Sequence, residues 1–180
     1  MTNRRGFDDL TMNLYLLRHG IALAQDDPSV SHDRERPLSH KGVKRMRKAA
    51  RGILRLAVPF DAVLTSPLLR ARETAEIVAA TLGIEELLEE ISGLAPESSV
   101  EHLIFGLTRY QDRKHLLLVG HEPLLSETAA SFLSGGKQNR HLNLAFKKGS
   151  LCHIEIDSLT SAEPGRLHSL LTPKQLRSLA

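Results

Sequence analysis

Three short polar motifs in this sequence contain residue types that can carry out phosphoryl transfer. They are Arg18-His19-Gly20, Ser66-Pro67 and Gly120-His121. Arginine offers a planar, permanently charged pair of donors that suits a phosphoryl group, and a neutral imidazole is a competent nucleophile near pH 7. Two histidines with at least two arginines therefore favour phosphoryl transfer if the fold brings the motifs together.

Each motif directly follows a short apolar run that is typical of a buried strand. The runs cover residues 12–17, 62–64 and 116–119. The carboxyl ends of parallel strands lie at one edge of a sheet, and open α/β sheets bind their ligands there. We therefore expect the three motifs to converge at one edge.

Helical patterns separate these strands. One helix begins near Ser39, and a second opens at Ser66-Pro67 and ends with Gly83 as its C-cap. Two more cover residues 98–107 and 124–133. This alternation predicts an α/β fold, a three-layer α/β/α sandwich around a mainly parallel sheet.

The last third of the chain predicts antiparallel strands. Residues 143–146 and 151–156 alternate between apolar and polar on either side of Lys147-Lys148-Gly149, which is typical of a hairpin. Residues 166–171 are a further candidate strand, and a weaker extended piece surrounds residues 87–88. The hairpin would make the sheet mixed.

Length and composition limit the class of protein. The chain has 180 residues, of which 41% are hydrophobic and 25% charged. We expect residues 12–180 to form one domain, with residues 1–11 as an N-terminal extension. No apolar run approaches the length of a membrane span, and residues 1–11 lack the apolar segment of a secretory signal. We therefore expect a cytoplasmic protein without a membrane partner.

The single cysteine and the charge balance add little chemistry. Cys152 excludes an intramolecular disulfide and is interpreted as a packed thiol. Residues 41–55 carry seven basic residues and no acid, which makes either a solvated helix face or a docking surface for an acidic partner. Aromatic residues make up 4% and tryptophan is absent, so no base-stacking platform is evident and a nucleic-acid partner is not expected.

The motifs occur in an order and spacing that resemble the histidine phosphatase superfamily. Three further segments resemble its small SixA-type phosphohistidine phosphatases, and together the resemblance covers roughly residues 12–178. It implies a phosphoglycerate mutase-like fold. The superfamily segments are LLRHG at 16–20, SPLLRARETAEIV at 66–78 and LLLVGHEPLL at 116–125; the SixA-type segments are RPLSHKG at 36–42, GLAP at 93–96 and LLTPKQLR at 170–177.

The resemblance also implies roles for individual residues. His19 would be the nucleophile that becomes phosphorylated, and Arg18, Arg70 and His121 would complete the phosphate pocket. Gly20 is predicted to bind substrate, since a glycine lets the backbone or a substrate oxygen approach closely without interference from a Cβ.

Arg36 matches the arginine before Pro-Leu in the SixA-type branch. It would contact phosphate or the partner, or it is simply a solvated loop residue.

The remaining polar candidates favour structural roles. Thr65 and Ser66 have no adjacent base and are interpreted as loop or capping hydrogen bonders. Gly135-Gly136-Lys137 lacks the rest of a P-loop. The other histidines show no metal-ligand spacing, so neither a metal nor a cofactor is expected. They are His32, His40, His102, His115, His141, His153 and His168.

A general acid is not evident in the sequence. Ester-cleaving branches of the superfamily place a carboxylic acid opposite the nucleophile, and here only Glu97 is near the expected position, where it equally suits the start of a helix. The imidazole of a phosphohistidine leaves readily once protonated. The resemblance therefore predicts a phosphohistidine phosphatase whose partner is a histidine-containing phosphotransfer protein. The alternatives are a small phosphomonoesterase with Glu97 or His121 as acid, and a non-catalytic phosphoprotein-binding module.

Overall fold

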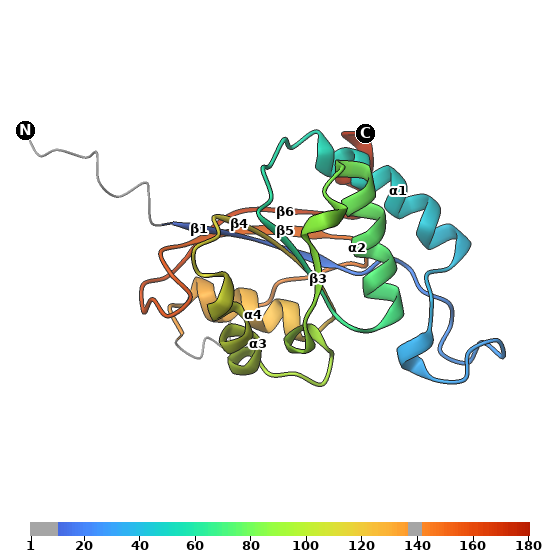
Figure 1. Cartoon of the computed structure of the whole chain (residues 1–180), viewed down its shortest axis with the longest axis horizontal. Coiled ribbons are helices and arrows are strands. Elements are labelled where there is room, and N and C mark those ends of the chain that lie inside the picture. Colours follow the sequence, from blue (N-terminus) through green and yellow to red (C-terminus); the bar gives the residue numbers. More distant parts are fainter. Residues whose placement is uncertain (1–10, 137–141) are drawn as a thin grey trace, which may run out of the picture.

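A six-stranded sheet in the order β3-β2-β4-β1-β5-β6 forms the centre of the protein (Figure 1). The structure, a computed structural model, describes residues 11–136 and 142–180. The first four strands are mutually parallel, whereas β5 runs antiparallel to β1 and β6 antiparallel to β5. The strands are β1 (Met12–Arg18), β2 (Ala62–Thr65), β3 (Leu88–Glu90), β4 (His115–Gly120), β5 (Leu151–Ile156) and β6 (Arg166–Leu171).

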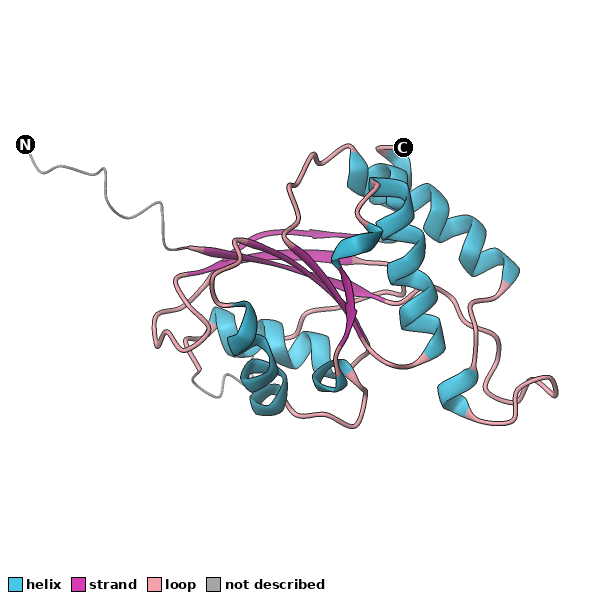
Figure 2. Ribbon diagram, in the orientation of Figure 1, coloured by secondary structure: helices cyan, strands magenta, loops and turns pink. Residues whose placement is uncertain are grey.

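Helices cover both faces of this sheet (Figure 2). One face carries α1, α2 and α5, and the other carries α3 and α4. This arrangement confirms the predicted three-layer sandwich with a mainly parallel, mixed sheet. None of the helices in the described residues is long and apolar enough to cross a membrane. The helices are α1 (His40–Leu54), α2 (Leu69–Leu82), α3 (Val100–Leu107), α4 (Leu124–Leu133) and α5 (Pro173–Ser178).

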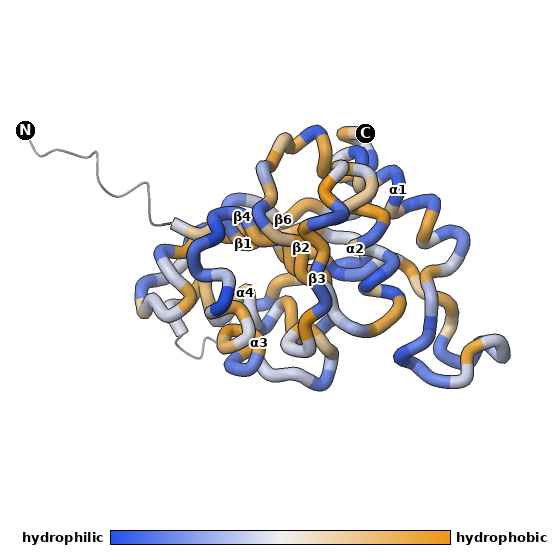
Figure 3. The backbone as a smooth tube through the Cα atoms, viewed as in Figure 1, coloured by the Kyte–Doolittle hydropathy of each residue, from blue (hydrophilic) through white to orange (hydrophobic). Residues whose placement is uncertain are grey.

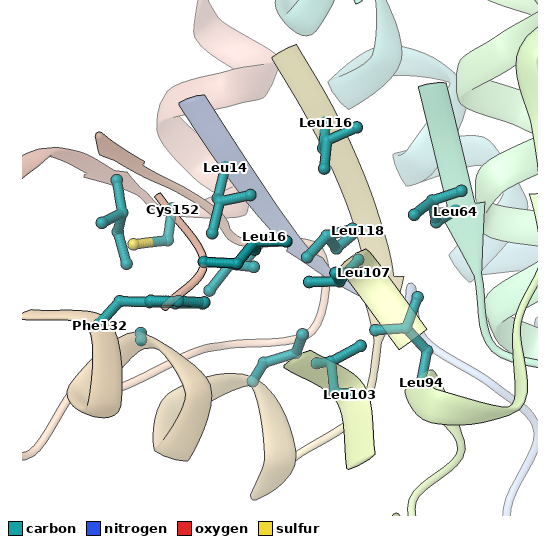
Figure 4. Packing of buried hydrophobic residues seen from close by; sticks show 14 of the residues in the cluster. Leu14, Leu16, Leu64, Leu94, Leu103, Leu107, Leu116, Leu118, Phe132 and Cys152 are labelled. Atoms are coloured by element: carbon teal, nitrogen blue, oxygen red, sulfur yellow. The ribbon is translucent and has the colours of Figure 1, made fainter. Parts of the chain in front are cut away.

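The core consists of two apolar layers, one on each side of the sheet. Side chains of β1 alternate between them, so that Leu14 and Leu16 pack toward α3 and α4 while Leu17 packs toward α1 and α2. The hydrophobic strands are visible at the centre of the fold (Figure 3). Cys152 is fully buried in the first layer (Figure 4), and burial raises the pKa of its thiol to about 12. The interpretation of Cys152 as a packed thiol is confirmed.

Several predicted boundaries are confirmed by local hydrogen bonds and dihedral angles. Ser39 caps α1, since its Oγ accepts a hydrogen bond from the Gly42 N–H at 3.1 Å. Gly83 ends α2 in the left-handed conformation, with φ of 69°. The helix predicted from Ser66-Pro67 begins only at Leu69, and the helix predicted over 98–107 begins at Val100 after the Ser99 cap.

The predicted hairpin of residues 143–146 with 151–156 is wrong. Both edges of β5 are already paired, one with β1 and the other with β6, so no edge remains for residues 143–146. The Phe146 carbonyl instead accepts a hydrogen bond from Arg18 Nη1 at 2.5 Å. The antiparallel partner of β5 is β6, which confirms the candidate strand at 166–171.

Candidate active site

The carboxyl ends of β1, β2 and β4 bring the three polar motifs together as predicted. The His19 N–H donates to the Gly120 carbonyl at 3.1 Å, and the Ser66 N–H donates to the Val119 carbonyl at 3.0 Å. The rings of His19 and His121 lie with their centroids 5.0 Å apart. Residues more than 100 positions apart in sequence thus share one site because parallel strands end at the same edge.

His19 is fixed in one tautomer by its own loop. Its Nδ1 lies 2.7 Å from the Gly20 carbonyl oxygen, which can only accept, so Nδ1 carries the proton. The lone pair is therefore on Nε2, the nitrogen available for attack on phosphorus. Burial is the main cause that lowers the pKa of His19, and repulsion from His121 in its protonated form is the second. The pKa of His19 falls to about 3, so the ring is neutral at pH 7.

His121 is buried, with one ring nitrogen bonded and one unpartnered. Nε2 lies 2.8 Å from Ser66 Oγ. Ser66 Oγ accepts from the Leu68 N–H at 3.3 Å, so its O–H can donate to Nε2, which leaves the ring proton on Nδ1. Ser66 is a loop hydrogen bonder as predicted, but the premise that it has no adjacent base is wrong, because His121 contacts it. Nδ1 has no hydrogen-bond partner among the described residues. Burial and then the Arg70 charge lower the pKa of His121 to about 3. An unpartnered buried nitrogen is a position that a ligand oxygen can satisfy.

Arg70 and Arg18 supply further buried donors at the same place. Arg70 lies in the first turn of α2 and is 5% exposed, with Nη1 donating to the Asp33 carbonyl and Nη2 to the Asp33 carboxylate at 2.8 and 3.0 Å. The Nε of Arg70 and that of Arg18 are buried without a partner within the described residues. The site therefore joins a neutral nucleophile to guanidinium groups that retain donors for an anion.

Asp33 is a site residue that sequence reasoning missed. Its carboxylate binds Arg70 and also Arg36, whose Nη2 lies 2.8 Å from Asp33 Oδ1. Although burial alone would raise it, the two arginines hold the pKa of Asp33 below its usual value. Arg36 is thereby linked to Arg70 through Asp33. The sequence signal that could have indicated Asp33 is its position three residues before Arg36, a spacing that allows an ion pair.

Gly20 lies in a tightly packed position beside His19. Its N–H donates to Thr74 Oγ1 at 3.0 Å and its carbonyl accepts from His19, so both backbone groups are used inside the protein. A Cβ at position 20 would lie 2.6 Å from Met46 Cγ of α1, so the glycine permits close helix packing. Gly20 therefore helps to position His19 and lets α1 pack closely; its role in substrate binding stays a prediction.

Lys148 is a second residue that sequence reasoning missed, because its turn was interpreted as the tip of a hairpin. The next residue, Gly149, donates its N–H to the carbonyls of Arg18 and His19 at 3.0 and 3.1 Å. Partial burial and then the charges of Arg18, Arg36 and Arg70 lower the pKa of the Lys148 ammonium. Lys148 thus adds a cation at the edge of the pocket.

Among residues 11–136 and 142–180, the carboxylates near the site do not include a buried acid that is free of partners. Glu97 Oε1 lies 3.1 Å from Arg34 Nη1, and both side chains are more than half exposed, at 62% and 63%. Glu101, not Glu97, is the acid in the first turn of α3, so the interpretation of Glu97 as a helix-dipole residue is wrong. Glu122 is half-buried and accepts from the Ser126 N–H at 3.2 Å; burial raises the pKa of its carboxyl.

Comparison with known proteins places the chain in a family. The sequence model of the histidine phosphatase superfamily (branch 1) matches residues 14–96. Phosphohistidine phosphatase SixA of Escherichia coli (strain K12) is 31% identical over 127 residues, which is 69% of this chain and 76% of that protein. An uncharacterised protein of Picosynechococcus sp. is 43% identical over 171 residues, 92% of this chain and 99% of its own length. The chain belongs to the histidine phosphatase superfamily, branch 1.

Solved structures agree with this assignment. The structure of the protein histidine phosphatase SixA complexed with tungstate superposes with a TM-score of 0.77 at 26% identity, covering 92% of this chain and 99% of that one. Phosphoglycerate mutase from Bacillus anthracis shares the fold with a TM-score of 0.64 at 16% identity, covering 97% of this chain and 99% of its own. The predicted phosphoglycerate mutase-like fold is confirmed.

The buried neutral histidines make stability depend on pH. His19 and His121 have pKa values of about 3 in the folded protein, against about 6.5 when unfolded. Between about pH 6 and 4 the unfolded chain binds protons that the folded chain does not, so the free energy of unfolding falls as the pH falls. Each histidine contributes a slope of up to about 1.4 kcal/mol per pH unit.

Urea unfolding between pH 7 and 4 measures this slope in the wild type and in His121→Asn. We expect the variant to have the shallower dependence, whatever its absolute stability. Equal slopes would show that His121 titrates alike in the folded and unfolded chains.

Asp33 is expected to position Arg70. Replacing Asp33 with asparagine removes the charge that holds two guanidinium groups together, so Arg70 loses its fixed orientation and kcat falls about 10-fold. Inorganic phosphate should inhibit the variant at least as strongly as the wild type, because a negative charge has been removed from an anion site. Unchanged kcat with weaker phosphate inhibition would contradict this role.

Proposed function

We propose that this protein is a phosphohistidine phosphatase that works through a phospho-His19 intermediate. The observation that carries the proposal is the state of His19, a buried neutral imidazole whose Nδ1–H is held by the Gly20 carbonyl, leaving Nε2 free. Guanidinium groups with unpartnered buried donors lie in the same pocket. A fixed neutral nucleophile beside preorganised positive charge is the arrangement that phosphoryl transfer requires.

The reaction would proceed in two displacements. The His19 Nε2 lone pair attacks phosphorus and the bond from phosphorus to the substrate nitrogen breaks. The substrate ring, already protonated on its other nitrogen, keeps the bonding electron pair and leaves as a neutral imidazole. Water then attacks phospho-His19 in line, giving inorganic phosphate and regenerating neutral His19. Arg18 and Arg70 would stabilise the charge on the transferring oxygens, with His121 donating a further hydrogen bond.

The carboxylates around the pocket support a phosphohistidine substrate. Asp33 is paired with two arginines, and Glu97 is exposed and paired with Arg34. Neither is suited to give a proton to an alkoxide, because an ion-paired carboxylate stays ionised. An imidazole leaving group makes less demand on an enzymic acid than an alkoxide does.

The relatives support a phosphoprotein substrate. SixA of Escherichia coli is named a phosphohistidine phosphatase, and a SixA structure holds tungstate, which is an oxyanion like phosphate. By this likeness, we propose that the partner is a phosphorylated histidine-containing phosphotransfer protein. Turnover sets this proposal apart from a phosphoprotein-binding module, which would bind such a partner without releasing phosphate.

Rates on a series of phosphate esters test the substrate class. Without an enzymic acid, kcat/KM should fall steeply as the leaving alcohol becomes more basic, so that an aryl phosphate reacts slowly and a sugar phosphate hardly at all. A phosphohistidine protein should react far faster than either. The measurement is phosphate release from all three substrates at one enzyme concentration.

A flat dependence on the leaving group would favour the phosphomonoesterase alternative instead. Glu122 is the residue that favours it, because burial raises the pKa of its carboxyl next to His121. Glu122→Gln and Glu97→Gln would then be compared, and selective loss of ester hydrolysis in one of them would identify the acid.

A further inference from the structure

A groove with a basic lining lies beside the end of β1, outside the phosphate pocket. It has a volume of about 210 Å³ and is bounded by the residues after β1, one side of α1, the turn before β5 and the start of α5. None of the described residues that line it is acidic. Its charged side chains are Arg45, Lys147, Lys148, Lys174 and Arg177.

These five cations have no acidic partner within the part of the chain that the structure describes. Other basic residues do have one: Arg72 lies near Glu76 and Glu90, and Arg109 lies near Glu89. Unpaired charges of one sign in a concave surface reinforce one another and attract the opposite sign. The groove is therefore suited to an acidic ligand.

The groove is joined to the active site through the turn before β5. Gly149 is hydrogen-bonded to the carbonyls of Arg18 and His19, and Lys148 precedes it directly. Partial burial, and then the charges of Arg18, Arg36 and Arg70, lower the pKa of Lys148, in keeping with its place between the groove and the pocket. A substrate whose phosphoryl group reaches His19 would thus have its neighbouring residues beside the groove.

The structure also divides the basic run of α1 into two parts. Arg45 faces this groove, whereas Arg47 and Arg51 line a separate hollow between α1 and α2 that contains Glu76. The first part lies next to the active site and the second does not. Of the two alternatives for residues 41–55, the docking surface therefore fits Arg45, and the solvated face fits Arg47 and Arg51.

We infer that this basic groove binds acidic residues that flank the phosphorylated histidine of the protein substrate. The inference rests on the proposed function and adds the chemistry by which the partner is recognised. Electrostatic contacts of this kind promote encounter and binding more than the chemical step. The groove should therefore lower KM for an acidic phosphoprotein and leave kcat almost unchanged.

Two synthetic phosphohistidine peptides of equal length test the inference, one with Asp and Glu around the histidine and one with Asn and Gln. At low salt, we expect the wild type to have about a 10-fold higher kcat/KM for the acidic peptide, with the difference in KM. The preference should shrink as salt is raised, because exposed charges are screened. Lys147→Glu/Lys174→Glu should abolish the preference while keeping the wild-type kcat/KM for p-nitrophenyl phosphate.

The matched control is Arg47→Glu/Arg51→Glu, which changes the net charge equally but in the other hollow, and it should keep the preference. Equal kcat/KM of the wild type for both peptides would overturn the docking inference and leave the proposed function standing. An equal loss of preference in the two double variants would also overturn it, since net charge alone would then explain the effect. Hydrolysis of p-nitrophenyl phosphate but of neither peptide would overturn the proposed function and the docking inference together.

Discussion

His19→Ala is expected to reduce turnover of a phosphohistidine protein by roughly 10⁴-fold or more while the protein stays folded. His19 is the only group proposed to form a covalent bond to phosphorus, and its Nε2 is the nitrogen left free by the Gly20 contact. His19 is neutral in the folded chain at pH 7 and mostly neutral in the unfolded chain, so alanine changes the charge balance of folding little and the protein should stay folded. Phosphate release and a thermal melt measure the two effects.

His168→Ala is the matched control for this substitution. His168 lies on the edge strand β6 and contacts Glu155, away from the pocket. It should keep near-normal turnover. Near-normal turnover in His19→Ala itself would show that another residue is the nucleophile.

Arg70→Ala should cost about 3 kcal/mol of transition-state stabilisation, a loss on the order of 100-fold in kcat/KM. Its guanidinium is 5% exposed and holds Asp33 through two nitrogens while keeping Nε unpartnered within the described residues. Arg70→Lys should recover little, because one ammonium cannot reproduce that geometry toward Asp33 and the phosphoryl group at once.

Arg72→Ala tests whether position matters on α2. Arg72 is half exposed and lies near Glu76 and Glu90, so its loss should change kcat/KM little. If Arg70→Lys were as active as the wild type, Arg70 would supply only diffuse charge. If Arg72→Ala lost as much kcat/KM as Arg70→Ala, the loss would come from the reduced positive charge of α2 as a whole and not from the position of Arg70.

The fold could be predicted from sequence because its signals are local. Apolar runs ending in polar motifs marked β1, β2 and β4, and Ser39 and Gly83 marked helix boundaries by capping. The hairpin around Lys147-Lys148-Gly149 failed because both edges of β5 are taken by distant strands. Which strands pair is decided by the whole sheet. Alternation in a short segment can predict a strand, but it cannot predict the strand's partner.

The site could be predicted only in part, for a related reason. His19, Arg18, Arg70 and His121 lie in motifs at the ends of strands or the start of a helix, so the topology brings them together. Asp33 lies in a single-turn 3₁₀ helix and Lys148 in a turn, and neither is long enough for a periodic pattern to mark a residue that will face a distant arginine. Gly20 was identified, but its contacts with Thr74 and Met46 could not be predicted, because they depend on packing between elements.

Rapid quenching of the reaction with a phosphohistidine protein that carries labelled phosphate tests the central claim most directly. We expect transient label on the enzyme that is lost in acid and kept in alkali, and that maps to His19. The label should be absent from His19→Ala and should decay at the rate at which phosphate appears. Label on another residue, or phosphate release by the wild type with no labelled enzyme at any time, would contradict the phospho-His19 mechanism.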